Sequence, residues 1–167
     1  MVKKRYMKKL LVFIALLNVS FGIFAFEFKP FYTGFKLEAN QNSYKRVAAG
    51  AGLESFYSFS DYFILGTTIL CSTDFSRFTT LEILLNPAYL FQFTFMKDRA
   101  RLSVGAACGY EQIHYDKNVL HIFSIGAEVR MFVRLGNLKK SKLCLVPVIR
   151  AGYPYIWSAG LSFGAKF

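Results

Sequence analysis

The chain of 167 residues has little of what would build a helical membrane protein or a disulfide-stabilised domain. Beyond residue 25 it contains no stretch of 18 apolar residues, although hydrophobic residues make up 54% of the whole, so no second membrane helix is expected. Its three cysteines are odd in number and scattered, which argues against a disulfide framework. Charged residues make up only 19%. A chain this apolar must therefore arrange its hydrophobic residues with a period shorter than that of a membrane helix.

The amino terminus has the features of an export signal. A basic segment is followed by an uncharged apolar run over residues 10–24, and Ala25 offers a small residue for cleavage. A run of about 15 residues is short for a hydrocarbon core of about 30 Å, which argues against a membrane anchor. No cysteine follows the run as in a lipoprotein. We therefore predict a signal peptide over residues 1–25 and one domain over residues 26–167. The basic residues of the segment are Lys3, Lys4, Arg5, Lys8 and Lys9.

Much of the net charge of +11 belongs to that signal. Removing its five basic residues leaves 16 Lys and Arg against 10 Asp and Glu, so the net charge of the predicted domain is +6. This balance is poor evidence for nucleic acid binding, and we predict no nucleic acid partner.

The hydrophobic period in the predicted domain is two. Large apolar side chains alternate with glycine, small, polar or charged residues, and successive residues of a strand face opposite sides of a sheet. Each strand should therefore have one apolar face and one polar face. The segment 62–72 carries too few charges to show which of its faces is polar. The alternating segments are 31–40, 46–54, 81–93, 101–111, 123–134, 143–150 and 157–167.

Seven turn-rich breaks separate these segments and predict eight strands joined as consecutive hairpins. A two-residue turn at 98–99 would place Thr94 opposite Ser103 and Asn86 opposite Glu111. A turn at 117–118 would place Glu111 opposite Ser124 and Arg101 opposite Arg134. Both arrangements keep polar faces together, so an antiparallel meander is the expected topology.

Alternation alone leaves open which face lies inside. A soluble eight-stranded barrel of the lipocalin or avidin type would enclose the apolar face, whereas a membrane barrel reverses this arrangement. Two features favour the reversal: glycines crowd the polar face, and the apolar face carries more bulk than an eight-stranded interior holds. We therefore predict an all-β fold, an eight-stranded antiparallel up-and-down transmembrane β-barrel. The glycines of the polar face are Gly34, Gly50, Gly52, Gly105, Gly109, Gly126, Gly160 and Gly164.

The signal peptide, the strand count and a last segment that ends on Phe167 resemble small eight-stranded bacterial outer-membrane barrels of the outer membrane protein A and X types. The resemblance implies residence in the outer membrane of a Gram-negative cell. It also implies delivery by periplasmic chaperones and insertion by the barrel-assembly machinery. The expected partner of the inserted barrel is outer-membrane lipid, and we expect a monomer. The connections expected outside the cell are shorter than is usual in those families. The assembly signal would comprise Trp157, Leu161, Phe163 and Phe167.

The enclosed face should carry an ion network. It allows two interpretations, an ion-selective channel or gated plug, and a lumen filled by paired charges. We favour the second, because eight strands leave room for little beyond side chains and buried charges must pair. The expected members are Lys36, Glu38, Arg46, Glu54, Glu82, Arg101, Glu111, Glu128, Arg130, Arg134 and Arg150, with Lys166 on the same face.

Enzyme signatures are weak. The segment 160–164 matches the G-x-S-x-G pattern, but that elbow needs a turn from strand to helix, and here it falls inside a strand. His114 and His121 should face each other on the lipid side, which separates them from Glu111 and Ser124 on the lumenal side. As a metal site the two histidines would be weak, because they supply only two ligands. We predict no catalytic residue, cofactor or metal, and expect a structural role in the envelope. One alternative is a narrow passage for small hydrophobic molecules that resembles the outer membrane protein W type, with a lateral exit at Pro87 or Pro147. Another is a lipid-modifying enzyme.

Overall fold

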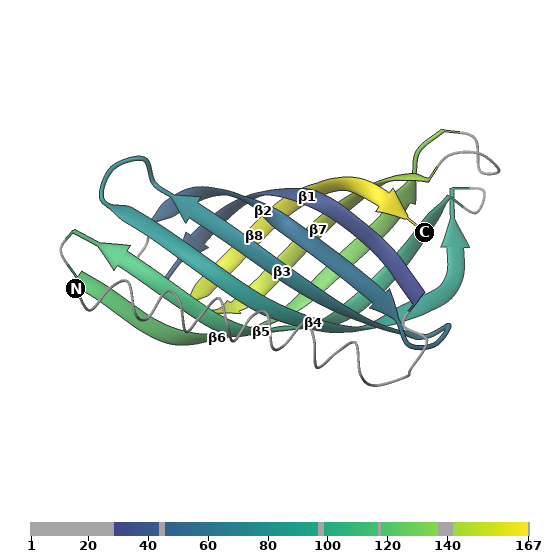
Figure 1. The fold of residues 1–167 in the computed structure, drawn as a ribbon, viewed down its shortest axis with the longest axis horizontal. Coiled ribbons are helices and arrows are strands. Elements are labelled where there is room, and N and C mark those ends of the chain that lie inside the picture. The colour runs from purple at the N-terminus through teal and green to yellow at the C-terminus, as the bar shows by residue number, and fades with distance from the viewer. Residues whose placement is uncertain (1–28, 44–45, 97–98, 117, 137–141, 167) are drawn as a thin grey trace.

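A computed structural model of the chain describes residues 29–43, 46–96, 99–116, 118–136 and 142–166. The described residues form eight strands that wind around a single cylinder (Figure 1). No helix in this part of the chain has the length and apolar character needed to cross a lipid bilayer. The predicted signal peptide, residues 1–25, lies outside the described residues. The strands are β1 (Lys29–Asn42), β2 (Val47–Ser58), β3 (Phe63–Thr73), β4 (Phe78–Phe95), β5 (Ala100–Tyr115), β6 (Asn118–Arg134), β7 (Leu143–Tyr153) and β8 (Tyr155–Lys166).

Each strand pairs antiparallel with its neighbours in sequence, and β1 pairs with β8 to close the barrel. At this closure Leu37 of β1 lies opposite Leu161 of β8. Closure gives every strand a partner on both sides, so no sheet edge runs the length of the barrel. The prediction of an eight-stranded antiparallel up-and-down transmembrane β-barrel is confirmed.

Exposed apolar side chains cover the outside of the barrel, and the buried charged side chains point into the lumen. Leu53 and Ile149 on the outer face are 62% and 65% exposed, whereas Arg130 on the inner face is 1% exposed. In β3, the segment of uncertain phase, Ile64 and Leu70 point inward. Both faces of β3 carry apolar residues, which explains why the alternation of charge could not show its orientation.

The predicted register between β4 and β5 is wrong. The structure pairs Thr94 with Arg101 instead of Ser103, and it pairs Glu111 with Glu82 instead of Asn86. Two features cause the difference. The turn lies earlier in the sequence than predicted, because β4 ends at Phe95 and β5 begins at Ala100, and a register irregularity between Leu90 and Thr94 shifts the pairing further. The displacements are even numbers of residues, so the described side chains of β4 and β5 keep their predicted faces.

The predicted register between β5 and β6 is also wrong, by two residues. Glu111 lies opposite Ile122 and Arg101 lies opposite Phe132, because Tyr115 and Asn118 already pair across the turn. His114 consequently lies opposite Val119 and does not face His121.

The two ends of the barrel differ. We call the end where β1 begins and β8 ends the terminal end, and the opposite end the distal end. The connections at the distal end are short, as predicted, and the turn between β7 and β8 consists of Pro154 alone. Because β7 ends at Tyr153 opposite Ile125, the part of β6 from Asn118 to Ser124 extends beyond β7. The hairpin of β5 and β6 therefore rises above the neighbouring wall at the distal end.

Two glycines allow close approach inside the barrel. A Cβ atom on Gly66 would lie 2.3 Å from the Phe56 ring, and one on Gly164 would lie 2.0 Å from the Thr33 carbonyl oxygen. Gly66 thus makes room for an aromatic ring in the lumen, and Gly164 allows β8 to approach β1 at the closure.

Candidate functional site

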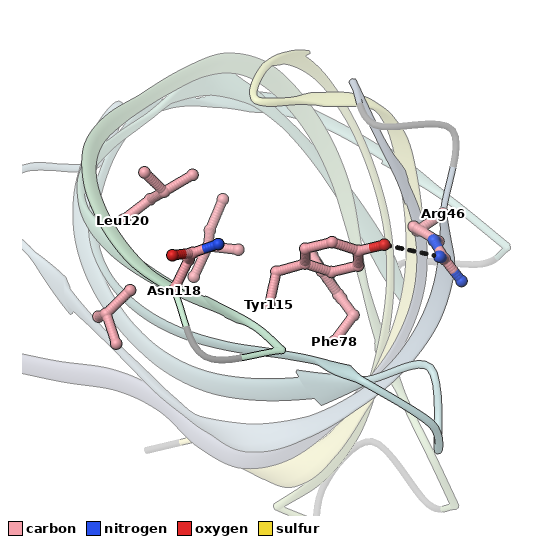
Figure 2. Close-up of a pocket in the computed structure, with 7 residues that line it drawn as sticks. Arg46, Phe78, Tyr115, Asn118 and Leu120 are labelled. Atoms are coloured by element: carbon pink, nitrogen blue, oxygen red, sulfur yellow. Dashed lines mark hydrogen bonds between the residues drawn. The ribbon is translucent and has the colours of Figure 1, made fainter.

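The lumen contains three layers of side chains, and the one nearest the distal end, called the apolar layer here, is built around an apolar cluster. Phe78 and Ile113 are buried there together with Ala48, and Ile122 packs against them. Above this layer lies an open cavity of about 500 Å³. In Figure 2, Tyr115 reaches toward Arg46 on one side of the cavity, and Leu120 and Asn118 lie on the other. The lining residues are Arg46, Phe78, Ile113, Tyr115, Asn118, Val119 and Leu120.

Two ion clusters form the middle layer, and the first is centred on Arg130. Its guanidinium donates from Nη1 to Glu54 Oε2 at 2.6 Å and from Nε to Glu128 Oε1 at 2.8 Å. Glu128 also accepts from Asn86 Nδ2 at 3.1 Å. The guanidinium carbon lies 4.6 Å from the centre of the Phe56 ring, a cation–π distance. Arg130 is therefore compensated by two carboxylates and one aromatic face.

The second ion cluster is centred on Arg150. Its guanidinium lies 3.2 Å from Glu38 Oε1 and 2.9 Å from Glu82 Oε2. Glu38 also pairs with Lys36 Nζ at 2.5 Å. All these side chains are buried, so each depends on its partners to compensate for the loss of hydration. The clusters bring together the predicted residues Lys36, Glu38, Glu54, Glu82, Glu128, Arg130 and Arg150.

Glu111 joins this layer through a neutral partner. Tyr155 donates its hydroxyl to Glu111 Oε1 at 2.6 Å, and Glu82 lies directly opposite Glu111 on the next strand. Within the described lumen, five buried carboxylates face three buried cations, and Glu111 Oε2 has no hydrogen-bond partner. Glu111 is thus the carboxylate whose negative charge is least compensated by the described ion pairs.

Three predicted members lie outside the two clusters. Arg46 lies at the distal rim, where its side chain is 42% exposed and pairs with Asp74 at 3.3 Å. Arg101 and Arg134 are partly exposed near the terminal end, within electrostatic range of Lys166. Alternation placed all three on the inner face, but it carries no information about depth along the barrel axis.

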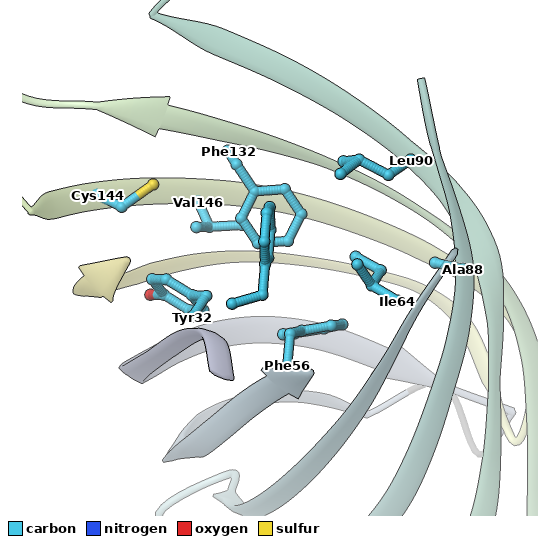
Figure 3. Packing of buried hydrophobic residues seen from close by; sticks show 9 residues of the cluster. Tyr32, Phe56, Ile64, Ala88, Leu90, Phe132, Cys144 and Val146 are labelled. Carbon is cyan, nitrogen blue, oxygen red and sulfur yellow. The ribbon is translucent and has the colours of Figure 1, made fainter. Parts of the chain in front are cut away.

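An aromatic cluster fills the lumen at the terminal end. Figure 3 shows Tyr32, Phe56 and Phe132 gathered inside the wall. Phe132 makes edge-on contacts with the rings of Phe31, Tyr32 and Phe56 at centroid distances of 5.1, 5.7 and 5.7 Å. Such geometry is favourable for aromatic pairs. The aromatic cluster consists of Phe31, Tyr32, Phe56, Ile64, Ala88, Leu90, Phe132, Cys144 and Val146.

Sequence reasoning missed Tyr155, the hydroxyl donor of the middle layer. Its position is two residues before Trp157, which faces outward, so strict alternation would place it outside. The register shifts where Gln41 pairs with Trp157 and Asn42 pairs with Tyr155, and this shift turns the tyrosine inward. Asn86 was expected inside, and its contact with Glu128 could not be read from sequence because the two residues are 42 positions apart.

The residues considered for catalysis do not meet. His114 and His121 lie on the outer face, where His114 contacts Gln112 and His121 contacts Tyr110. Ser162 is buried in the lumen and shares a hydrogen bond of 2.6 Å with Tyr32. No group of three or more His, Cys, Asp and Glu among the described residues could hold a metal ion.

The residues of the predicted assembly signal share the outer face of β8. Trp157, Leu161 and Phe163 are all exposed there, and Trp157 Nε1 donates to Gln41 Oε1 at 2.9 Å. Phe167, the last member, lies outside the described residues.

Comparisons with solved structures agree on the fold. The chain is similar to the N-terminal β-barrel domain of Pseudomonas aeruginosa OprF, with a TM-score of 0.55 and 15% identity over 81% of this chain and 97% of that one. Neisserial surface protein A gives a TM-score of 0.56 and 15% identity over 83% and 96%. A de novo designed transmembrane β-barrel gives 0.54 and 14% over 83% and 98%. No family model and no curated protein matches the chain. The shared feature is therefore the eight-stranded transmembrane barrel itself.

Proposed function

We propose that this chain is an integral outer-membrane protein with a structural role in the cell envelope and a lumen closed by its own side chains. The observation that carries this proposal is the stack of two ion clusters and an aromatic cluster across the barrel. Each ion cluster joins strands that are distant in sequence, so the charges compensate one another across the lumen. The proposal assigns no catalysis to the barrel and treats it as a monomer.

The proposed location combines the fold with the amino-terminal segment. The segment 1–25 acts as a cleaved signal, and the terminal end of the barrel faces the periplasm. Mass spectrometry of protein purified from outer membranes should find Phe26 as the first residue. Chaperones and the barrel-assembly machinery would recognise the last strand, so loss of the aromatic rings at Phe163 and Phe167 should lower the amount of folded barrel. The folded fraction is measured by its altered gel migration before heating.

Conductance tests the closed lumen directly. Purified barrel in a planar lipid bilayer should show no steady opening of nanosiemens size, because the buried side chains of the ion clusters and the aromatic cluster occupy the described lumen. Stable large openings in the wild-type protein would refute the closed lumen.

A passage for small hydrophobic molecules is the second candidate. The apolar layer of Phe78 and Ile113 below the distal cavity favours entry of such molecules. The lateral exits considered for this function lie deeper. Pro87 follows Asn86, which contacts the Arg130 cluster, and Pro147 follows Val146 of the aromatic cluster. A molecule would have to pass buried charges to reach either exit, so the closed barrel remains the preferred function.

A further inference from the structure

We propose that the distal mouth of the barrel binds a single-chain amphiphile with a carboxylate head group, of the fatty acid class. Binding at this site needs no conduction through the lumen and goes beyond a structural role. The site is the cavity above Phe78 and Ile113, with Arg46 on its rim.

The size of the cavity suits one small ligand. Its volume of about 500 Å³ lies within the usual range for ligand pockets, about 300–1,000 Å³. Below it, the apolar layer and the Arg150 cluster close the lumen. The cavity therefore ends blindly, which favours binding over passage.

Four of the seven described residues that line the cavity are aliphatic or phenylalanine. The buried rings and methyl groups of Phe78 and Ile113 form its floor. Leu120 lines the wall from the inner face of β6. It is 43% exposed because it lies at the open mouth of the barrel. An alkyl chain in the cavity would remove its own surface and the exposed surface of Leu120 from water, which is the general driving force for binding such chains.

One residue of the outer face also lines the cavity. Val119 belongs to the outward phase of β6, together with Phe123 and Ile125, and yet it lines the same cavity as Leu120. This is possible because β6 extends beyond the end of β7 in this region. An amphiphile could therefore enter sideways from the outer leaflet with its chain leading.

Among the described residues that line the cavity, Arg46 alone carries a charge, and in this proposal it selects the head group. Its guanidinium contacts Asp74 at 3.3 Å and Tyr115 Oη at 3.2 Å. The Asp74 carboxylate already accepts the backbone N–H groups of Ser76, Arg77 and Phe78 at 2.9–3.1 Å, so the turn itself holds it in place. A guanidinium has five N–H donors in a planar fork that matches a carboxylate. Arg46 can therefore keep both described contacts and still bind an anionic head group.

Photo-crosslinking tests the site in the full mature barrel, folded in phosphatidylcholine nanodiscs. The probe is a dodecanoic acid with a diazirine in its chain, and labelled peptides are mapped by mass spectrometry. We expect labels on the peptides that contain Phe78, Ile113 and Leu120. Dodecanoate should compete with the probe, whereas dodecyltrimethylammonium, which carries the opposite charge, should not.

Two arginines of the distal end provide a matched pair of variants. Arg46→Gln should weaken probe binding at least about tenfold, because a hydrogen-bonded charge pair is lost. Arg77→Gln is the control: Arg77 lies on the neighbouring turn, is 71% exposed and pairs with Asp116, but does not line the cavity. Leu120→Glu should also abolish labelling of the cavity, because it places a negative charge beside the alkyl chain. Gel migration before heating confirms that each variant is folded.

Equal labelling of Arg46→Gln and Arg77→Gln would overturn the proposal. Labels confined to outward residues such as Phe123 and Ile125 would overturn it as well, because they would show partition into the lipid phase alone. Neither outcome bears on the closed lumen, which the conductance measurement tests separately.

Discussion

Replacing Arg130 by methionine should destabilise the folded barrel strongly. Methionine fills much of the space of the arginine stem, so the change mainly removes the cation. It leaves Glu54 and Glu128 buried on opposite walls, without the donor that now lies 2.6 and 2.8 Å from them. Asn86 still donates to Glu128, but in the described structure no other cation pairs with Glu54.

Breaking a buried ion pair by removing one partner costs about 3–5 kcal/mol. We therefore expect the free energy of unfolding to fall by about this amount in Arg130→Met. Urea unfolding in lipid vesicles would measure it, with fluorescence of Trp157, the single tryptophan of the chain, as the probe. Trp157 lies on the outer face of β8, so its emission should change when the strand leaves the lipid.

Two comparisons make this measurement decisive. Arg77→Met removes an exposed pair with Asp116 and should cost less than about 1 kcal/mol. The triple variant Arg130→Met, Glu54→Gln, Glu128→Gln removes the uncompensated charges and should lie within about 1.5 kcal/mol of the wild type. If Arg130→Met unfolds like Arg77→Met, or if the triple variant is as unstable as the single one, the ion cluster does not stabilise the lumen as described.

Three further predictions follow from other layers and faces. Glu111→Gln keeps an acceptor for the Tyr155 hydroxyl and should change the free energy of unfolding in urea by less than about 1 kcal/mol. Glu82→Gln removes a charge that pairs with Arg150 and should lower this free energy by more. The reverse order would contradict the described charge distribution. Leu37→Arg, on the outer face in the middle of β1, should cost about 2–4 kcal/mol in a bilayer, and Val47→Arg at the strand end about 0–1; equal costs would contradict the membrane orientation. The backbone N–H groups of Phe78 and Ser76 hold the pKa of Asp74 below its ordinary value of 3.8, so the turn keeps this stabilisation above that pH and loses it as the pH falls through the lowered pKa. Amide exchange at Phe78 should therefore accelerate in acid relative to Asp74→Asn, and identical acid profiles would rule the effect out.

The sequence predicted which way most side chains face because a strand alternates strictly and charges occur on one face only. Lys36, Glu54 and Arg130 lie inside for this reason. β3 lacked this signal, since Ile64 and Ile69 are equally apolar although one points inward and the other outward.

Pairing and depth could not be predicted in the same way. With the irregularity between Leu90 and Thr94, Glu82 lies opposite Glu111, where Asn86 was predicted. No residue type in that segment predicts an irregularity. The clustering of Arg130 with Glu54, and the separation of Arg46 from both, depend on how far each strand is displaced along the barrel axis. That displacement is a property of the closed barrel, and it cannot be predicted from the sequence of a single strand.

The position of Arg130 and Glu54 on β6 and β2 has a consequence for how the barrel is completed. In a ring of eight strands these two are four strands apart in either direction, so their side chains span a full diameter. An unrolled sheet holds them far apart, and Glu54 is then without the cation that it pairs with in the barrel. The continuous wall and the pairing of Arg130 with Glu54 are therefore gained in the same event, and opening the barrel between any two strands would lose both.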